Sequence, residues 1–489
     1  MTSDGRTRIE KDSMGEMPVP ADALYGASTQ RAVLNFPISG RAVPHAVIRA
    51  YAVLKSACAS VNRDLGLLDD RRAADIANAC SQIEAGLPDF GGLAPHFPVD
   101  IFQTGSGTST NMNTNEVVAN LACLAHGEPI GRSKDPAWYK DASDSGAGGV
   151  HPNDHVNMGQ SSNDTFPTAM HISAARAIAD RLRPAVASLA GSLEAKAAAW
   201  DDVVKIGRTH LQDATPIRLG QEFGGFAAQL RQADARLARA LDTLSELPLG
   251  GTAVGTGINT HPEFGRRVAA AVAETTGLPF READNHFEAQ HAKDAFVEAS
   301  GHLRTLAVSL SKIANDIRWL GSGPRCGIGE LKLPAVQPGS SIMPGKVNPV
   351  ICEAVIMVAC QVAGNDQAVT LGAFGGVGSI LDLNVAMPMM AANLLDSADL
   401  LSGACDTFRT KLVEGLEPDR ERCEALIEGS LAMCTSLVPV IGYDASAKLA
   451  YEAYESGKTI RALALEQGLL SADDLERLLD PISMTRPMA

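Results

Sequence analysis

Residues 303–320 read LRTLAVSLSKIANDIRWL, and their apolar positions decide the fold class. Leucine or isoleucine recurs at intervals of three and four residues: Leu303, Leu306, Leu310, Ile313, Ile317 and Leu320. This spacing places the apolar side chains along one face of an α-helix. A second apolar stripe follows Thr215-Pro216 and continues to Leu244. Helices of about thirty residues reach roughly 45 Å, so the sequence predicts an extended bundle of long helices.

The composition agrees with a helical protein and argues against some classes of binding partner. Only 4% of the 489 residues are aromatic, and the net charge is −15, from 42 basic and 57 acidic residues. A chain this acidic is a poor partner for nucleic acid or an anionic membrane. Met1–Met17 lacks the apolar segment of a secretory signal, and no run of eighteen apolar residues predicts a membrane span.

The nine cysteines include no Cys-x-x-Cys pair. A disulfide framework, a zinc site and a conventional iron–sulfur cluster therefore lack support. A reduced, cytoplasmic setting fits this usage best.

Three parts of the chain differ in pattern, and we predict a domain for each. Residues 1–160 combine irregular polar segments with helices, and within them Ser133–Gly149 reads as an exposed insertion. Residues 161–417 contain the long helices, and residues 418–489 read as a small C-terminal domain of short charged helices. We therefore expect an all-α fold. Several long amphipathic helices in one chain also indicate that bundles from different subunits pack together.

The stretch from Gly339 to Pro349, GSSIMPGKVNP, precedes another predicted helix. Its glycines and prolines predict a loop with both mobile and stiff points, and Asn348 has the place of an N-cap. Four polar side chains are thus presented at a helix N-terminus: Ser340, Ser341, Lys346 and Asn348. Backbone N–H groups and a lysine favour an anion there, although a plain capping loop fits the pattern equally well.

A nucleotide phosphate loop is excluded, because five residues separate Gly339 from Gly345 and valine follows the lysine. Two further small-polar loops, at Thr104–Thr108 and Ser161–Thr165, also run into helices. His210 lies in a loop between helices, flanked by Arg208 and Asp213. It is either a structural histidine or an acid/base group.

No metal site is predicted. His151 and His155 are four residues apart, which on a helix could form a metal-binding face. Pro152 and the crowded Asn and Asp residues argue against a helix there. Many hydroxyls and amides with one lysine and one histidine instead suit a small dicarboxylate and proton transfer beside a carboxylate.

These loops resemble those of the class II fumarases in the aspartase/fumarase superfamily, and the resemblance runs nearly from end to end. It includes Asp12–Glu16, Thr104–Thr108, His151–Asp154, Ser161–Thr168, Gly207–His210 and Gly339–Pro349. Within the superfamily, Thr209-His210 and Gly345 before Lys346 resemble fumarases, whereas aspartases typically have glutamine and alanine at the positions of His210 and Gly345.

The resemblance implies reversible hydration of fumarate to L-malate in the citric acid cycle, without metal or other cofactor. Water would add and leave in anti geometry through an aci-carboxylate intermediate. It also implies a homotetramer of three-domain chains, whose long helices form a common core and whose sites combine residues of three subunits. The alternatives are an aspartate ammonia-lyase and an inactive structural protein on the same scaffold.

The resemblance also assigns residues. The catalytic residues would be Ser340 as the base, His210 for the water at C2, Glu353 as the partner of that histidine, and Lys346. Substrate would be bound by Ser106, Gly107, Thr108, Ser161, Ser162, Asn163, Thr209, Ser341, Lys346, Val347 and Asn348. A secondary anion site of the family corresponds to His151, Asn153 and Asp154. The basic residue that precedes it in the family falls near Gly148 here, which predicts weak anion binding.

Overall fold

The computed structural model describes residues 6–140 and 148–487, and it is built mainly from α-helices. Its strands form only two-stranded sheets within this described part. The prediction of a helical fold is confirmed. The chain divides into two compact units, each assembled from three stretches. Unit 1 comprises Met1–Arg183, Arg236–Arg304 and Gln361–Leu400, and unit 2 comprises Pro184–Ala235, Thr305–Cys360 and Leu401–Ala489. The predicted limits at residues 160 and 417 stay predictions.

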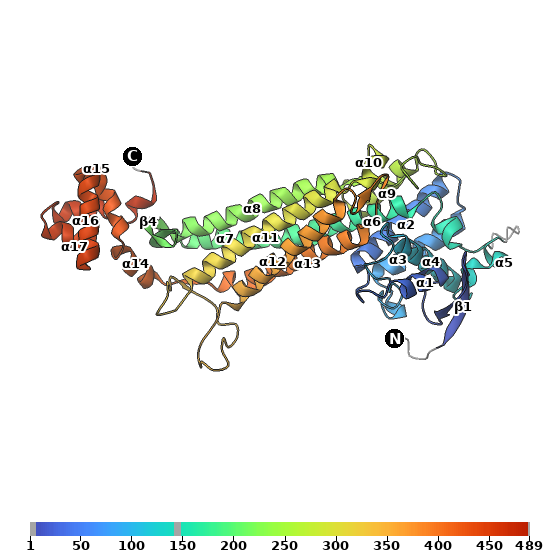
Figure 1. Cartoon of the computed structure of the whole chain (residues 1–489), viewed down its shortest axis with the longest axis horizontal. Helices are drawn as coiled ribbons and strands as arrows, with labels where there is room; N and C mark the ends of the chain where they lie inside the picture. The colour runs from blue at the N-terminus through green and yellow to red at the C-terminus, as the bar shows by residue number, and fades with distance from the viewer. Residues whose placement is uncertain (1–5, 141–147, 488–489) are drawn as a thin grey trace. The chain divides into compact units, whose positions relative to one another are not determined.

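Unit 1 is organised around helix α2 (His45–Asp64). The helices that pack against it are α3 (Asp70–Ala85), α4 (Thr108–Ala125), α6 (Ser162–Arg176) and α9 (Phe264–Thr276) (Figure 1). Val47, Tyr51, Leu54 and Cys58 recur every three or four residues along α2 and are all buried. The hairpin of β1 (Thr7–Asp12) and β2 (Gly15–Pro20) packs on α1 (Ala27–Asn35).

Two helices of unit 1 begin at the small-polar loops seen in the sequence. At α6, Ser161 and Asp164 form a capping box, in which each side chain accepts a backbone N–H. At α4, the N-cap is Gly107 with φ +74°, and a Cβ there would lie 1.9 Å from the ring of Phe166. Only glycine fits this conformation and this approach. The two loops are therefore fixed beside each other by α6.

The predicted apolar stripes are buried. All six stripe residues of α11 (Asp294–Leu320), from Leu303 to Leu320, are at most 5% exposed. In α8 (Leu219–Leu244), Phe223, Phe226 and Leu230 are likewise buried. The stripes are core faces, as their spacing predicts.

Unit 2 contains a β-hairpin where the sequence predicted a loop between helices. Strands β3 (Val204–Thr209) and β4 (Gln212–Arg218) pair with His210 and Leu211 as the two-residue turn. Both turn residues have positive φ, +58° and +62°, which is the type I′ geometry of tight hairpins. The expectation of a loop between helices was wrong, because the turn joins two strands. This turn lacks the Asn-Gly or Asp-Gly signature that usually identifies such a hairpin.

The C-terminal part of unit 2 has its own apolar core. Its helices are α14 (Arg420–Glu428), α15 (Val438–Ile441), α16 (Tyr443–Ser456), α17 (Ile460–Glu466) and α18 (Ala472–Leu478). Side chains from α14, α16, α17, the region of α18 and the turn before α15 meet in one cluster: Ile427, Met433, Leu437, Leu449, Ala453, Ile460, Leu463, Ala464, Leu475 and Leu479. Helix α14 also packs against β3.

One helix of the described residues, α12 (Val350–Ala373), is long and apolar enough to cross a membrane by length and composition alone. The segments Arg420–Glu428 and Leu431–Ile441, which are bent by 67° relative to each other, are long and apolar enough only when they are taken together. Core helices of bundles meet it too. In α12, Asp366 accepts hydrogen bonds from Ser300 and Arg304 at 2.8 and 2.7 Å, so its inner side is tied to α11.

Three local predictions need correction or limitation. Pro152–Val156 forms a π-helical turn, because the proline stands at its first position, where its missing N–H is not needed. Helix α12 begins at Val350, one residue later than predicted, and the Asn348 side chain bonds to Gly339 rather than capping. Positions 141–147 of the predicted Ser133–Gly149 insertion lie outside the described residues. Its first residue is not exposed, since Ser133 is buried and bonds to Asn120.

Candidate active site

In unit 1, the predicted binding residues of two loops meet. The Oγ1 of Thr108 lies 2.9 Å from the Oγ of Ser106 and 2.7 Å from the Oγ of Ser162. A hydroxyl both donates and accepts, so this short chain can turn its hydrogens toward a ligand carboxylate. Ser106 is buried, and the other two hydroxyl groups belong to half-buried residues.

The neighbouring residues of α6 are also held in place. The Oγ of Ser161 accepts the N–H of Asn163. The Nδ2 of Asn163 donates to the carbonyl of Ala253 at 2.8 Å, in the glycine-rich loop Gly250–Gly257. Unit 1 thus brings Ser106, Gly107, Thr108 and Ser161–Asn163 together in one polar cluster.

In unit 2, the hairpin turn presents Thr209 and His210 to solvent, since both are exposed. A buried ionic cluster lies beneath the hairpin. Arg208 donates to both oxygens of Glu330, at 3.0 and 2.9 Å, and the Nζ of Lys205 lies 3.3 Å from the same carboxylate. Glu330 is fully buried. These charges connect the hairpin to the segment that leads through β7 (Leu331–Lys332) toward the Gly339–Pro349 loop.

The base of the Gly339–Pro349 loop is closed by two hydrogen bonds. The N–H of Gly339 donates to the carbonyl of Lys346 at 2.8 Å, and the Nδ2 of Asn348 donates to the carbonyl of Gly339 at 2.6 Å. Above this closure, Ser341, Lys346 and Val347 are exposed. Figure 1 shows the loop projecting from the helix that follows it, α12.

The two serines of this loop differ in their surroundings. The Oγ of Ser340 accepts the backbone N–H groups of Ile342 and Met343, at 3.2 and 3.0 Å. Hydrogen-bond donors of this kind stabilise negative charge on the oxygen they face. Ser341 is exposed. The geometry therefore favours Ser340 over Ser341 as the residue whose oxygen could carry charge.

Glu353 lies one turn into α12 and is exposed. Within residues 6–140 and 148–487, no hydrogen bond or ion pair joins His210, Glu353 and Ser340 to one another. The predicted residues thus form one group in unit 1 and separate groups in unit 2. A site that combines residues of several subunits stays a prediction.

Comparisons with known proteins identify the family of the chain. A family model described as "Lyase" matches residues 15–364, and one described as "Fumarase C C-terminus" matches residues 433–486. The chain is 53% identical to a class II fumarate hydratase of Halobacterium salinarum, over 99% of this chain and 98% of that protein. The chain belongs to the class II fumarate hydratase family.

Two further members of the class II fumarate hydratase family extend the match. A fumarate hydratase class II of Corynebacterium glutamicum is 51% identical over 98% of this chain and 96% of that protein. The crystal structure of a recombinant class II fumarase from Schistosoma mansoni superimposes with a TM-score of 0.92 at 38% identity. That alignment covers 99% of this chain and all of the Schistosoma chain.

In the predicted secondary anion segment of this fumarase family member, the histidine is neutral and an acidic residue lies beside it. The Nδ1 of His151 accepts the N–H groups of Asn153 and Asp154, at 3.3 and 3.1 Å. Burial lowers the pKa of His151, so its imidazole is neutral at pH 7. The carboxylate of Asp154 lies 3.4 Å from it. Lys134 and Lys140 also act electrostatically on this histidine, so weak anion binding stays a prediction.

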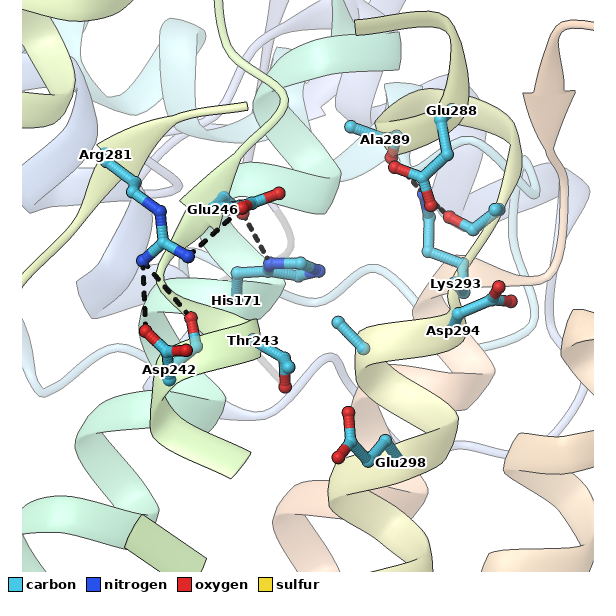
Figure 2. Close-up of a pocket in the computed structure, with 12 residues that line it drawn as sticks. His171, Asp242, Thr243, Glu246, Arg281, Glu288, Ala289, Lys293, Asp294 and Glu298 are labelled. Atoms are coloured by element: carbon cyan, nitrogen blue, oxygen red, sulfur yellow. Dashed lines mark hydrogen bonds and ion pairs between the residues drawn. The ribbon is translucent and has the colours of Figure 1, made fainter. Parts of the chain in front are cut away.

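A cavity of about 490 Å³ in unit 1 lies away from the predicted residues of this fumarase family member. Figure 2 shows its lining, where Arg281 bridges Asp242 and Glu246 and where His171 bonds to the carbonyl of Glu246. Its charged side chains are two cations and five carboxylates: Arg281, Lys293, Asp242, Glu246, Glu288, Asp294 and Glu298. This excess of negative charge disfavours a dicarboxylate, so we do not place the substrate there.

Three residues that the sequence analysis left without a role make hydrogen bonds next to the predicted site residues of this fumarase family member. They are Asp164, Arg208 and Glu330. Asp164 and Arg208 stand inside recognised motifs, and the capping-box spacing of Ser161 and Asp164 was a usable signal. Glu330 is far from Arg208 in sequence, so only the fold reveals their contact. Within the described residues, no three His, Cys, Asp or Glu side chains lie close enough to hold a metal ion.

Proposed function

We propose that this chain is a fumarate hydratase, a hydro-lyase that interconverts fumarate and L-malate. The observation that carries the proposal is the identity of 51% and 53%, over nearly the whole chain, with proteins named fumarate hydratase class II. The polar groups needed for a dicarboxylate are all present in this chain. Water adds to fumarate in anti geometry, and the intermediate is an aci-carboxylate.

Ser340 acts as the base that removes the C3 proton of malate. An isolated serine hydroxyl is a poor base, because its alkoxide is costly in water. The N–H groups of Ile342 and Met343 at its Oγ, together with the ammonium of Lys346, lower this cost. The loop closes over the substrate and excludes water, which strengthens each of these interactions.

His210 transfers the proton of the water that leaves or enters at C2. Glu353 of another chain is its partner, since a carboxylate orients an imidazole and favours its protonated form. The exposure of both residues in the single chain is consistent with such a contact between subunits.

The substrate carboxylates are held by two sets of donors. Lys346, Asn348 and Ser341 bind one carboxylate and the negative charge that develops on it. The hydroxyl cluster of Ser106, Thr108 and Ser162, with Gly107, Ser161, Asn163, Thr209 and Val347, completes the binding shell. No metal or other cofactor takes part in this proposal.

The active form is a homotetramer in a cytoplasmic setting. Helix α12 supports this, because Met357 and Leu371 are 66% and 50% exposed in the single chain although the helix is strongly apolar. Single exposed apolar side chains are common, so the support comes from the apolar character of the whole helix. A common core of long helices from four chains would cover them.

The test is an assay of the purified protein on fumarate and on L-malate. We expect the ultraviolet absorbance of fumarate to fall as the enzyme hydrates it, in an assay that contains no ammonia. A chelator should leave the rate of this reaction unchanged. Formation of aspartate from fumarate and ammonia, without malate, would establish the aspartate ammonia-lyase instead. Absence of both reactions would favour the structural protein.

A further inference from the structure

We infer that Asp164 is a positioning residue for the substrate-binding segment Ser161–Asn163, because its single buried carboxylate fastens that segment to the glycine-rich loop Gly250–Gly257. The inference rests on the proposed function, since Ser161–Asn163 is a binding segment only within it. Asp164 itself faces away from substrate and acts through its neighbours.

The two oxygens of Asp164 serve different segments. Its Oδ1 accepts the N–H of Ser161 at 2.9 Å, and its Oδ2 accepts the N–H groups of Gly250 and Thr252 at 3.2 and 2.9 Å. Asp164 is fully buried. Hydrogen bonds to an ionised acceptor are stronger than neutral ones, and a buried carboxylate depends on them. The carboxylate therefore fixes the start of α6 relative to the glycine-rich loop.

The ionised form is the one that makes these three bonds. Burial raises the pKa of Asp164 to about 6, against the backbone N–H groups and the ammonium of Lys55, which lower it. At pH 7 the group is thus mostly a carboxylate, which accepts on both oxygens. An amide at this position would present an NH₂ group to one set of N–H donors.

The glycine-rich loop needs such an anchor. Thr252 is a β-branched residue with φ +53°, and its Oγ1 is buried without a hydrogen-bond partner among the described residues. Such a conformation persists only where the surroundings determine it. Asp164 holds its N–H, and the Nε2 of Gln290 (in α10, His286–His291) holds its carbonyl at 2.8 Å.

The position of this loop determines how one predicted binding residue, Asn163, is held. Ala253 follows Thr252, and its carbonyl accepts the Nδ2 of Asn163 at 2.8 Å. Loss of the Asp164 anchor would release Thr252, shift the Ala253 carbonyl and let the Asn163 amide rotate. It would also remove half of the capping box that sets Ser161. The expected consequence is weaker binding of substrate rather than loss of the base.

The chain offers a matched control in Glu116. This residue is also a buried carboxylate that accepts three backbone N–H groups, those of Gly26, Ser28 and Thr29. It fastens the start of α1 to α4 and touches no predicted site residue. A purely structural effect of losing a buried carboxylate should appear in both variants.

The experiment compares Asp164→Asn and Glu116→Gln with wild type in the full-length protein, with fumarate and with L-malate. Asp164→Asn should raise KM about tenfold and leave kcat within about twofold, which is the signature of lost binding. Glu116→Gln should lower the melting temperature and leave KM unchanged. An unchanged KM in Asp164→Asn, or an equal rise in Glu116→Gln, would overturn the inference. Absence of wild-type turnover would instead remove the proposed function.

Gln290→Met decides the matter if Asp164→Asn does not fold. This change keeps the size of a buried side chain and removes only the amide that holds the Thr252 carbonyl. A folded variant with a raised KM and a normal kcat supports the anchored loop. A folded variant with wild-type KM contradicts it.

Discussion

Ser340 and Ser341 are adjacent residues of one type, and the structure separates their chemistry. Only resemblance distinguished them in the sequence. In the folded loop, two backbone N–H groups converge on the Oγ of Ser340, whereas Ser341 is exposed. The residue identities of the site were thus available from the motif, but the reason for choosing one hydroxyl was not, because it depends on the backbone path of the loop.

Replacement of Ser340 by alanine should therefore lower kcat about a thousandfold, the scale of general base catalysis. Ser341→Ala is the matched control and should mainly raise KM, since Ser341 binds a carboxylate in the proposal. Steady-state kinetics on L-malate measure both effects, and gel filtration checks that assembly is unchanged. Near-normal kcat in Ser340→Ala would remove this serine from the role of base.

His171 should make the protein sensitive to acid. Burial, with help from the charge of Lys293, lowers its pKa to about 4. Below pH 6.5 the unfolded chain binds a proton at this position that the folded chain refuses, so the free energy of unfolding falls as the pH drops from 6.5 to 4. The shift corresponds to a loss on the order of 3 kcal/mol at the acid end.

His171→Phe should flatten this dependence, because phenylalanine cannot titrate and can stack on Phe296 as His171 does. Its stability at pH 7 should be lower, since the bond to the Glu246 carbonyl is lost. Denaturant midpoints at pH 7, 6 and 5 test this. His155, whose pKa is also lowered to about 4, accounts for acid sensitivity that remains. Parallel pH dependences in the two proteins would contradict the assignment.

Among the helices and strands, the sequence predicted those elements whose apolar residues repeat over a long stretch. The α11 stripe repeats over six apolar residues and predicted its buried face correctly. The β3–β4 hairpin has only six and seven residues per strand and an unusual turn, so its local pattern was too short to recognise. Strand β3 is held instead by Glu330, which comes from a distant part of the chain. Long-range charge pairing leaves no local signal.

Glu330→Gln should consequently destabilise the hairpin. The change leaves the buried Lys205 and the half-buried Arg208 beside an uncharged amide, and among the described residues only Lys205 keeps a second carboxylate, that of Glu222 at 3.4 Å. Breaking a buried ion pair in this way typically costs about 3 kcal/mol or more. Glu194→Gln is the control, because Glu194 forms an exposed pair with Arg231 worth less than about 1 kcal/mol. Thermal melts should show a clear decrease for Glu330→Gln only. Equal melting temperatures would show that the buried cluster is dispensable.

At the scale of the whole molecule, the candidate residues of one chain are divided between its two compact units. The hydroxyl cluster belongs to unit 1, while His210 and Ser340 belong to unit 2 and make no hydrogen bond to each other among the described residues. The sequence predicted a site shared between subunits only through the resemblance and the several long amphipathic helices. Which copy would complete which site is a property of the proposed assembly and leaves no pattern in the sequence of one chain.

Mixed tetramers provide the decisive measurement. Ser340→Ala and His210→Asn should each be inactive alone. If the two residues of a site come from different chains, random mixing of equal amounts places both intact residues in about a quarter of the sites. Co-expressed variants should then regain about a quarter of the wild-type rate. If both residues of a site came from the same chain, every site would keep one defect, and mixing would restore nothing. Separately purified variants, combined without dissociation, control for trace wild-type enzyme and should stay inactive.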